Sequence, residues 1–408
     1  MEQPKPLVDL LLLVGAILGK ALLEDVRQEQ LALLRLRRDR YEAAVTNKGP
    51  KHLLAFRQAP KRRWLGHRPD ATTAGELPAR YDGKTMLPDG RRLGAHLPLG
   101  TGMVRAVERA AEIGASAIQI FGDNPTAWRR RVEPPREQPA FRARLAELDI
   151  RPVTIHAAYL VNLAGPDPDF FERSVEVLSR ELQMAPGFGA TFVNVHTGSH
   201  RDTGVPAGTE RIAEGVVRSL AATEDKPDDA VLLLENSAGG GFGIGVTVEE
   251  LAGIAAAIAA CGIPDRRVGF CLDTAHAWGA GYRLSDPEAT DDLLAEFDAR
   301  IGLDRLRILH LNDSKSELGS HLDRHEHIGA GQIGEVGMAH LLRHPRLAHV
   351  TYYLETPGMD EGYDAINMAR AIALAEGRPL EPLPPGAMTL RGSRARTAPE
   401  PDVEASPA

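Results

Sequence analysis

Six side chains of the kinds that bind divalent metal ions end successive apolar runs in the middle of this 408-residue sequence. They are His156, His196, Glu235, Asp273, His310 and Glu355. Neighbours in this series are 37 to 45 residues apart. One such residue at the end of a strand is usually solvated or caps a helix, but six in the same position indicate a shared site. Imidazole and carboxylate together suit zinc, and less decisively manganese or iron.

Three further residues extend this set: His276 lies three positions after Asp273, and Asp323 and His325 lie together in a later loop. Nine candidate ligands exceed the needs of one tetrahedral ion and indicate a multinuclear cluster. The four carboxylates contribute −4 and three divalent ions would contribute +6, so a filled cluster would carry about +2. Such a site attracts phosphate, and closely spaced metal ions catalyse in-line displacement. Hydrolysis of a phosphodiester is therefore the expected reaction.

The elements that must position these residues are eight short apolar runs, separated by segments of helical periodicity such as 103–113, 141–148 and 248–260. The runs cover residues 93–97, 117–121, 153–156, 192–196, 231–235, 268–273, 306–311 and 351–355. Alternating strands and helices of this length predict a parallel sheet, and eight units close into a TIM (β/α)8 barrel. The carboxyl ends of the strands would then form one rim, where barrels build their active sites.

An open doubly wound sheet is the alternative fold for such a pattern. The glycine-rich residues 239–245 follow a strand, but they lack both a Gly-Lys-Ser/Thr sequence and a ribose-binding acid at the right spacing. We therefore expect a loop at these residues and a barrel as the fold.

The composition, 43% hydrophobic and 25% charged, is typical of a globular protein. Two cysteines, Cys261 and Cys271, cannot form a disulfide framework, so we expect a reduced, intracellular protein. The net charge of −8 means that nucleic acid would be attracted locally and not by the global field. The most apolar stretch, residues 10–18, is shorter than the ~20 residues that span a bilayer, and we expect no membrane partner.

Composition divides the chain into three parts. Residues 1–90 form an extension of unknown role, a predicted helix followed by a basic stretch at 27–68. Residues 91–376 form the predicted barrel. Residues 377–408 hold seven prolines, several arginines and few apolar side chains, so we expect a disordered tail.

Several long motifs between residues 91 and 375 resemble the endonuclease IV family, the zinc-dependent deoxyribonuclease IV enzymes. They are GAH at 94–96, NVHTGSH at 194–200, LENSAG at 234–239, CLDTAHA at 271–277, HLNDSK at 310–315 and GSHLDRH at 319–325. The resemblance implies a TIM barrel with three Zn²⁺ ions per chain, Mn²⁺ being an alternative at one site. Carried over by motif, His156, His196 and Glu235 would hold the first ion, Glu235, Asp273, His310 and Glu355 the second, and His276, Asp323 and His325 the third.

The resemblance also implies the reaction. The family hydrolyses the phosphodiester 5′ to an abasic site in base excision repair and leaves a 3′-hydroxyl and a 5′-deoxyribose phosphate. A hydroxide bridging two of the ions would attack phosphorus, with Glu235, Asp273 and Glu355 as the catalytic residues. Activity as a 3′-phosphodiesterase and phosphatase is implied as well. The expected partner is damaged double-stranded DNA, with no organic cofactor, and the expected state is a monomer in the cytoplasm, at the nucleoid when bound to DNA.

By the same resemblance, Tyr159, Leu160 and Asn124 would contact DNA. The first two would wedge into the duplex beside the extruded sugar. Two positions depart from the family pattern: Thr126 stands where the family often has an intercalating arginine, and Glu326 where a histidine is common. Arginines 129–131 follow Thr126 closely and are candidates to replace that arginine.

Two other functions fit part of the sequence. A single-metal sugar isomerase or epimerase on a related barrel would use Glu235, Asp273, His310 and Glu355. It would leave the other five candidate ligands without a role, which favours the nuclease. A non-catalytic DNA-binding protein would use the basic residues 27–68 and would leave the whole ligand set unexplained.

Overall fold

A computed structural model describes residues 86–389 except 224 and 227, so the predicted helix and basic stretch at the start of the chain lie outside the described residues. Eight parallel strands form a closed barrel in the order β1-β10-β7-β6-β5-β4-β3-β2. They are β1 Leu93–His96, β2 Ala117–Ile120, β3 Val153–His156, β4 Ala190–His196, β5 Val231–Glu235, β6 Val268–Asp273, β7 Leu306–His310 and β10 Thr351–Leu354. Every predicted apolar run overlaps one of these strands, and the predicted TIM barrel is confirmed.

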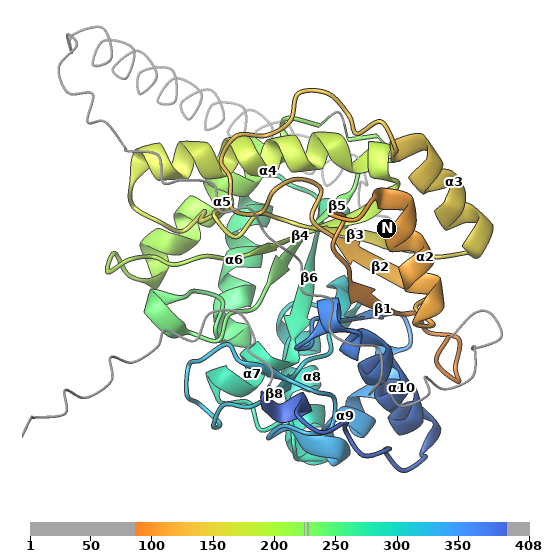
Figure 1. Ribbon diagram of the computed structural model, residues 1–408. Coiled ribbons are helices and arrows are strands. Elements are labelled where there is room, and N and C mark those ends of the chain that lie inside the picture. Colours follow the sequence, from red (N-terminus) through yellow and green to blue (C-terminus); the bar gives the residue numbers. More distant parts are fainter. Residues whose placement is uncertain (1–85, 224, 227, 390–408) are drawn as a thin grey trace, which may run out of the picture. The chain divides into compact units, whose positions relative to one another are not determined.

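Helices lie around the outside of the strands and connect each strand to its neighbour (Figure 1). They are α2 Met103–Glu112, α3 Gln138–Leu148, α4 Pro168–Phe188, α5 Val205–Leu220, α6 Val248–Ala260, α7 Thr274–Ala280, α8 Pro287–Arg300, α9 Gly334–Arg343 and α10 Tyr363–Glu376. A small antiparallel pair, β8 Asp313–Ser314 and β9 His325–Glu326, projects from the loop after β7. None of the helices in the described part of the chain has the length and apolarity needed to cross a membrane.

Local sequence signals set where the helices begin and end. Asp167 caps α4 by accepting a hydrogen bond from the Phe170 N–H, and Pro168 occupies the first turn. The same helix ends at Gly189, whose φ of 67° suits glycine. These caps fix the points at which the chain leaves each helix for the next strand.

The strands bury both faces, and the two faces form separate apolar clusters. The larger cluster packs strand residues against the helices. The smaller one consists of Ala117, Leu233, Cys271, Ile308 and Tyr353, which alternate with residues of the larger cluster and therefore face the barrel interior. Two positions further along these strands come Gln119, Glu235, Asp273, His310 and Glu355. Because side chains two apart share a face, the interior packing directs these polar groups to the barrel mouth.

The C-terminal boundary differs from the prediction. We expected disorder from residue 377, but residues 377–389 run along the barrel and end in a short helical turn, Ala387–Thr389. The Arg370 side chain donates to the Glu381 carbonyl, and the His327 ring to the Ala387 carbonyl. Ala387 is buried, and these contacts offset the entropic cost of ordering a segment whose composition favours disorder. Residues 390–408 lie outside the described residues.

Candidate metal centre at the barrel mouth

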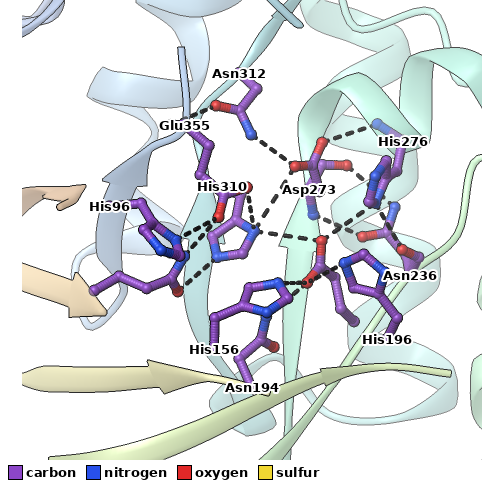
Figure 2. A network of polar contacts seen from close by, with 12 residues as sticks. His96, His156, Asn194, His196, Asn236, Asp273, His276, His310, Asn312 and Glu355 are labelled. Atoms are coloured by element: carbon purple, nitrogen blue, oxygen red, sulfur yellow. Dashed lines mark hydrogen bonds and ion pairs between the residues drawn. The ribbon is translucent and has the colours of Figure 1, made fainter. Parts of the chain in front are cut away.

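All nine predicted ligands lie at the carboxyl ends of the barrel strands or in the loops that follow them. Figure 2 shows His156, His196, Asp273, His276, His310 and Glu355 pointing toward one centre. The three innermost side chains, Glu235, Asp273 and His310, are fully buried. Glu235 stands at the middle, because its carboxylate lies 3.3–3.6 Å from ring nitrogens of four histidines. The structure therefore brings together residues that are as much as 199 positions apart.

Ligand atoms within this group fall into overlapping sets whose members lie within 4.8 Å of one another. The sets are His156–His196–Glu235, Asp273–His310–Glu355, Asp273–His276–His325 and Glu235–Cys271–His310. Asp323 joins the third set, with oxygens 3.3 Å from His276 Nε2 and 2.9 Å from His325 Nε2. Compact donor sets that share the carboxylates of Glu235 and Asp273 are the arrangement that a multinuclear metal site requires.

Backbone carbonyls orient three of the imidazoles. The Nδ1–H groups of His156, His276 and His325 donate to the carbonyls of Ala157, Asn236 and Glu355, at 2.8, 2.9 and 2.7 Å respectively. A carbonyl only accepts, so the proton sits on Nδ1 and the Nε2 lone pair of each ring faces the centre. His325 Nε2 is buried and makes no hydrogen bond. This is the usual outer contact of a metal-binding histidine.

Side-chain amides orient the carboxylates, and sequence reasoning missed their role. Asn194 donates to Glu235 at 2.6 Å, Asn312 to Asp273 at 2.7 Å, and Gln119 to Glu355 at 2.6 Å. Asn194 and Asn312 occur in the recognised motifs, and all three amides are fully buried. An amide in the middle of an apolar strand was the signal available for Gln119 and Asn194, and Asn194 also lies two positions before His196.

His96, at the end of β1, was also missed as a site residue. Its Nδ1 lies 3.2 Å from a Glu355 oxygen, and its buried Nε2 has no hydrogen-bond partner. Gln119 spans the same corner: its amide group reaches His96 Nδ1, and its carbonyl accepts from the His310 Nε2–H at 2.9 Å. This contact leaves His310 Nδ1 facing the carboxylates of Glu235, Asp273 and Glu355.

Electrostatics keep the Glu235 carboxylate ionised in spite of burial. Burial by itself would raise the pKa of Glu235, but the charges of His196 and His310 outweigh it and hold that pKa well below its usual value. Burial likewise opposes protonation of His325, yet the adjacent Asp323 raises its pKa to about 10. Protons on such histidines compete with metal ions for the same lone pairs, so metal affinity at this centre falls as pH is lowered.

The centre opens into a cavity of about 660 Å³ whose rim includes Tyr159, Lys315 and Arg324. Tyr159 is 61% exposed, and its ring contacts Phe121 with 5.0 Å between centroids. A second cavity of about 340 Å³ is also lined by Tyr159, together with Arg201 and His321. The mouth is thus an open groove that passes the candidate metal ligands and carries cationic side chains on its rim.

The other predicted DNA-contact residues differ in exposure. Leu160 is half-buried, whereas Asn124 is exposed and its side-chain oxygen accepts from both the backbone and the hydroxyl of Thr126. Of the arginines that follow, Arg130 is buried and donates to the Asn124 carbonyl at 2.8 Å, and Arg131 pairs with Asp123. Arg130 therefore cannot take the place of an intercalating arginine at Thr126.

Glu326, the second departure from the family pattern, is buried and turned away from the ligands. It follows His325 in β9, so the two side chains point to opposite faces. Its carboxylate accepts a hydrogen bond from the His327 N–H at 2.9 Å. The substitution therefore leaves the donor sets at the mouth intact.

A buried ion pair braces the two loops beside the mouth. Glu181 of α4 accepts from the Ala158 N–H at 3.3 Å and lies 3.7 Å from Arg130. Arg130 is held by the loop of Asn124, and Ala158 immediately precedes Tyr159. Glu181 Oε2 and Arg130 Nη2 have no hydrogen-bond partner. One side chain of α4 thus connects both predicted DNA-contact loops.

Glu181 should make stability depend on pH. Burial raises its pKa from 4.5 to about 7, and Arg130 only partly offsets that shift. The folded state therefore retains a proton that the unfolded state loses, and stability falls as pH rises from 4.5 to about 7. We expect Glu181→Gln to remove this component, up to about 3 kcal/mol. Urea unfolding of both proteins at about pH 5 and about pH 8 measures it, and parallel pH profiles would contradict the expectation.

Comparison with known proteins places this site in a family. A family model described as a xylose isomerase-like TIM barrel matches residues 107–375. A probable endonuclease 4 of Methanoculleus marisnigri is 42% identical over 283 residues, which are 69% of this chain and 98% of the relative. The crystal structure of endonuclease IV from Thermus thermophilus is 39% identical and covers 70% of this chain and 99% of that one, with a TM-score of 0.61. The chain belongs to the endonuclease IV family.

Membership of the endonuclease IV family confirms the resemblance read from the motifs and, with it, the prediction of a hydrolytic enzyme. A xylose isomerase domain protein from Planctomyces limnophilus is 16% identical with a TM-score of 0.51 and shares the fold alone. The endonuclease IV relative from M. marisnigri aligns over nearly all of its own length, so the barrel is the part that the family has in common with this chain.

Proposed function

We propose that the chain is an apurinic/apyrimidinic endonuclease that hydrolyses the phosphodiester 5′ to an abasic site. The products would be a 3′-hydroxyl and a 5′-deoxyribose phosphate, and 3′-phosphodiesterase and phosphatase activity would use the same site. The observation that carries the proposal is the convergence of nine ligands into donor sets that share Glu235 and Asp273. Relatives named endonuclease 4 support it.

The residues present fit three Zn²⁺ ions. Orphaned Nε2 of His325, the shared carboxylates and the oriented lone pairs are what such ions need. The first ion would be held by His156, His196 and Glu235, the second by Glu235, Asp273, His310 and Glu355, and the third by His276, Asp323 and His325, one of these sites also accepting Mn²⁺. Bound zinc lowers the pKa of water and neutralises phosphate charge.

The chain's own residues prepare the site for this chemistry. Glu235, Asp273 and Glu355, the proposed catalytic residues, are held in place by one amide each. Lys315 and Arg324 line the mouth, where they would pair with phosphates on either side of the scissile bond. The buried floor beneath these residues excludes water from all sides except the groove.

Tyr159 and Leu160 would enter the space beside the extruded sugar, and Asn124 would contact the same strand. We expect Tyr159→Ala to weaken binding of abasic duplex by about 1–3 kcal/mol, whereas Tyr159→Phe retains most of the affinity because the stacking ring remains. Fluorescence anisotropy of an uncleavable abasic duplex, titrated with the metal-loaded protein, measures the difference in affinity. Equal losses in both variants would contradict the wedge.

Removal of metal tests the proposed function. We expect prolonged chelation to abolish incision of a duplex carrying one abasic site and to remove three zinc ions per chain, and Zn²⁺ to restore activity. An intact duplex of the same sequence is the control substrate. Incision that survives complete metal removal would contradict the proposal.

A single-metal sugar epimerase is the second candidate, because the barrel also resembles a protein of the xylose isomerase type in fold. Turnover of a ketose with one bound metal, and no incision, would favour it. The five additional ligands favour the nuclease. We further propose a monomer that acts on damaged DNA in the cytoplasm, at the nucleoid, without an organic cofactor.

A further inference from the structure

A second group of metal-binding side chains lies in the outer helical layer, between α8 and α9. His340 lies in the last turn of α9, and His344 is the residue that directly follows this helix. Their Nε2 atoms lie 2.6 and 3.0 Å from the same oxygen of Asp291 on α8. None of the three lines the mouth cavity. Two imidazoles and a carboxylate thus meet at one point.

We propose that Asp291, His340 and His344 bind a divalent transition metal ion, with Zn²⁺ as the best-suited ion. Their ligand atoms all lie within 4.8 Å of one another. Two imidazoles and one carboxylate, completed by water, form a common zinc coordination set. Asp291 is 54% exposed, which leaves a side of the site open to solvent for that water.

Binding requires only a small rearrangement. Tetrahedral zinc with bonds of about 2.0–2.1 Å separates its ligand atoms by about 3.3 Å. The two nitrogen–oxygen pairs, now at 2.6 and 3.0 Å, must therefore move apart by about 0.7 and 0.3 Å. The His340 side chain is partly exposed, so it is free to change its side-chain torsion angles and permit this movement.

The ring protons of His340 and His344 affect how tightly the site binds zinc. His344 Nδ1 accepts from the Arg346 N–H at 3.3 Å, so its ring proton sits on Nε2 and points at Asp291. For zinc to bind, the ring proton of His344 must move from Nε2 to Nδ1, which breaks the Arg346 contact. Zinc must likewise replace the hydrogen bond between His340 and Asp291. Because loading breaks these hydrogen bonds, we expect weaker binding than at the barrel mouth.

A bound ion would connect α8 and α9, two helices that pack together and are otherwise joined here through the Asp291 hydrogen bonds. Because a ligand that binds only the folded state stabilises it, Zn²⁺ should raise the unfolding temperature. Incision should not change, since these side chains are outside the mouth.

Equilibrium dialysis of the full chain against Zn²⁺, followed by elemental analysis, tests the site. His340→Gln and His344→Gln are the variants, because glutamine can still donate a hydrogen bond to Asp291 but is a poor zinc ligand. His349→Gln is the matched control, as His349 donates to the Leu303 carbonyl outside the cluster. We expect each variant to bind one zinc fewer than the wild type and the control, to lose part of the zinc-induced rise in unfolding temperature, and to retain normal incision.

Two results would overturn the proposal. Equal zinc content in wild type and both variants would show that the three side chains do not bind an ion. An equal loss in His349→Gln would show that surface histidines bind zinc without a defined site. Since incision is measured separately, neither result bears on the metal centre at the barrel mouth.

Discussion

Glu235→Gln is expected to reduce incision of an abasic duplex by at least about 10³-fold, which corresponds to roughly 4 kcal/mol of barrier. The reason is the central place of this carboxylate, which lies near four histidines and belongs to two of the donor sets. Glutamine has nearly the same shape but carries no charge, so it cannot join two cations. Single-turnover incision at saturating Zn²⁺ measures the effect.

Glu326→Gln is the matched control for this prediction. Glu326 is also a buried glutamate, one residue from a proposed ligand, but its carboxylate only accepts the His327 N–H. We expect incision by this variant to stay within about twofold of the wild type, because a neutral amide oxygen accepts the same bond. If the two variants lost activity equally, the loss would reflect buried charge in general and not the metal centre.

Asn312→Leu should weaken zinc binding by about 10- to 100-fold, the usual cost of removing a group that orients a metal ligand. Asn312 donates to Asp273 at 2.7 Å and accepts from the Glu355 N–H at 2.9 Å. Leucine fills a similar volume but leaves Asp273 unrestrained and the Glu355 N–H without a partner. Competition with a chromophoric chelator gives the zinc affinity.

Excess zinc should restore incision by Asn312→Leu, because the ligands themselves are intact. Asn367→Leu is the control, since Asn367 is equally buried but bonds to Ile328 and the His327 ring, outside the nine proposed ligands. We expect that variant to lose about 1–3 kcal/mol of stability with unchanged zinc affinity. Zinc affinity that falls in both variants alike would assign the effect to general loosening of the fold.

Much of the site was predictable because the barrel links sequence position to spatial position. A residue such as Glu235, which ends an apolar run, must come to the carboxyl end of a strand, and in a closed parallel sheet all such ends meet at one rim. Side chains alternate between the two faces of a strand, so Glu235, two positions after the interior residue Leu233, also points inward. The long motifs added the family, which the comparisons confirm.

Residues whose role depends on a distant partner were not predictable in this way. Gln119 reads as one polar residue in a strand, and only the pairing of β1 with β10 and β2 brings it to Glu355. Arg130 reads as one of three exposed arginines, yet it is buried beside Glu181 of α4. Composition also suggested disorder after residue 376, where contacts to Arg370 and His327 order the chain as far as residue 389.

The sequence alone therefore determined the barrel, the residue types at its mouth and the family, since strand periodicity, residue type and motifs are local properties. The tertiary structure decided which amide orients each carboxylate, which arginine is buried, and that Asp291 of α8 meets His340 of α9 and His344 just after it. The physical reason is that hydrogen bonds and ion pairs depend on the separation of two atoms, and for residues far apart in the chain that separation is set only when the helices and strands pack.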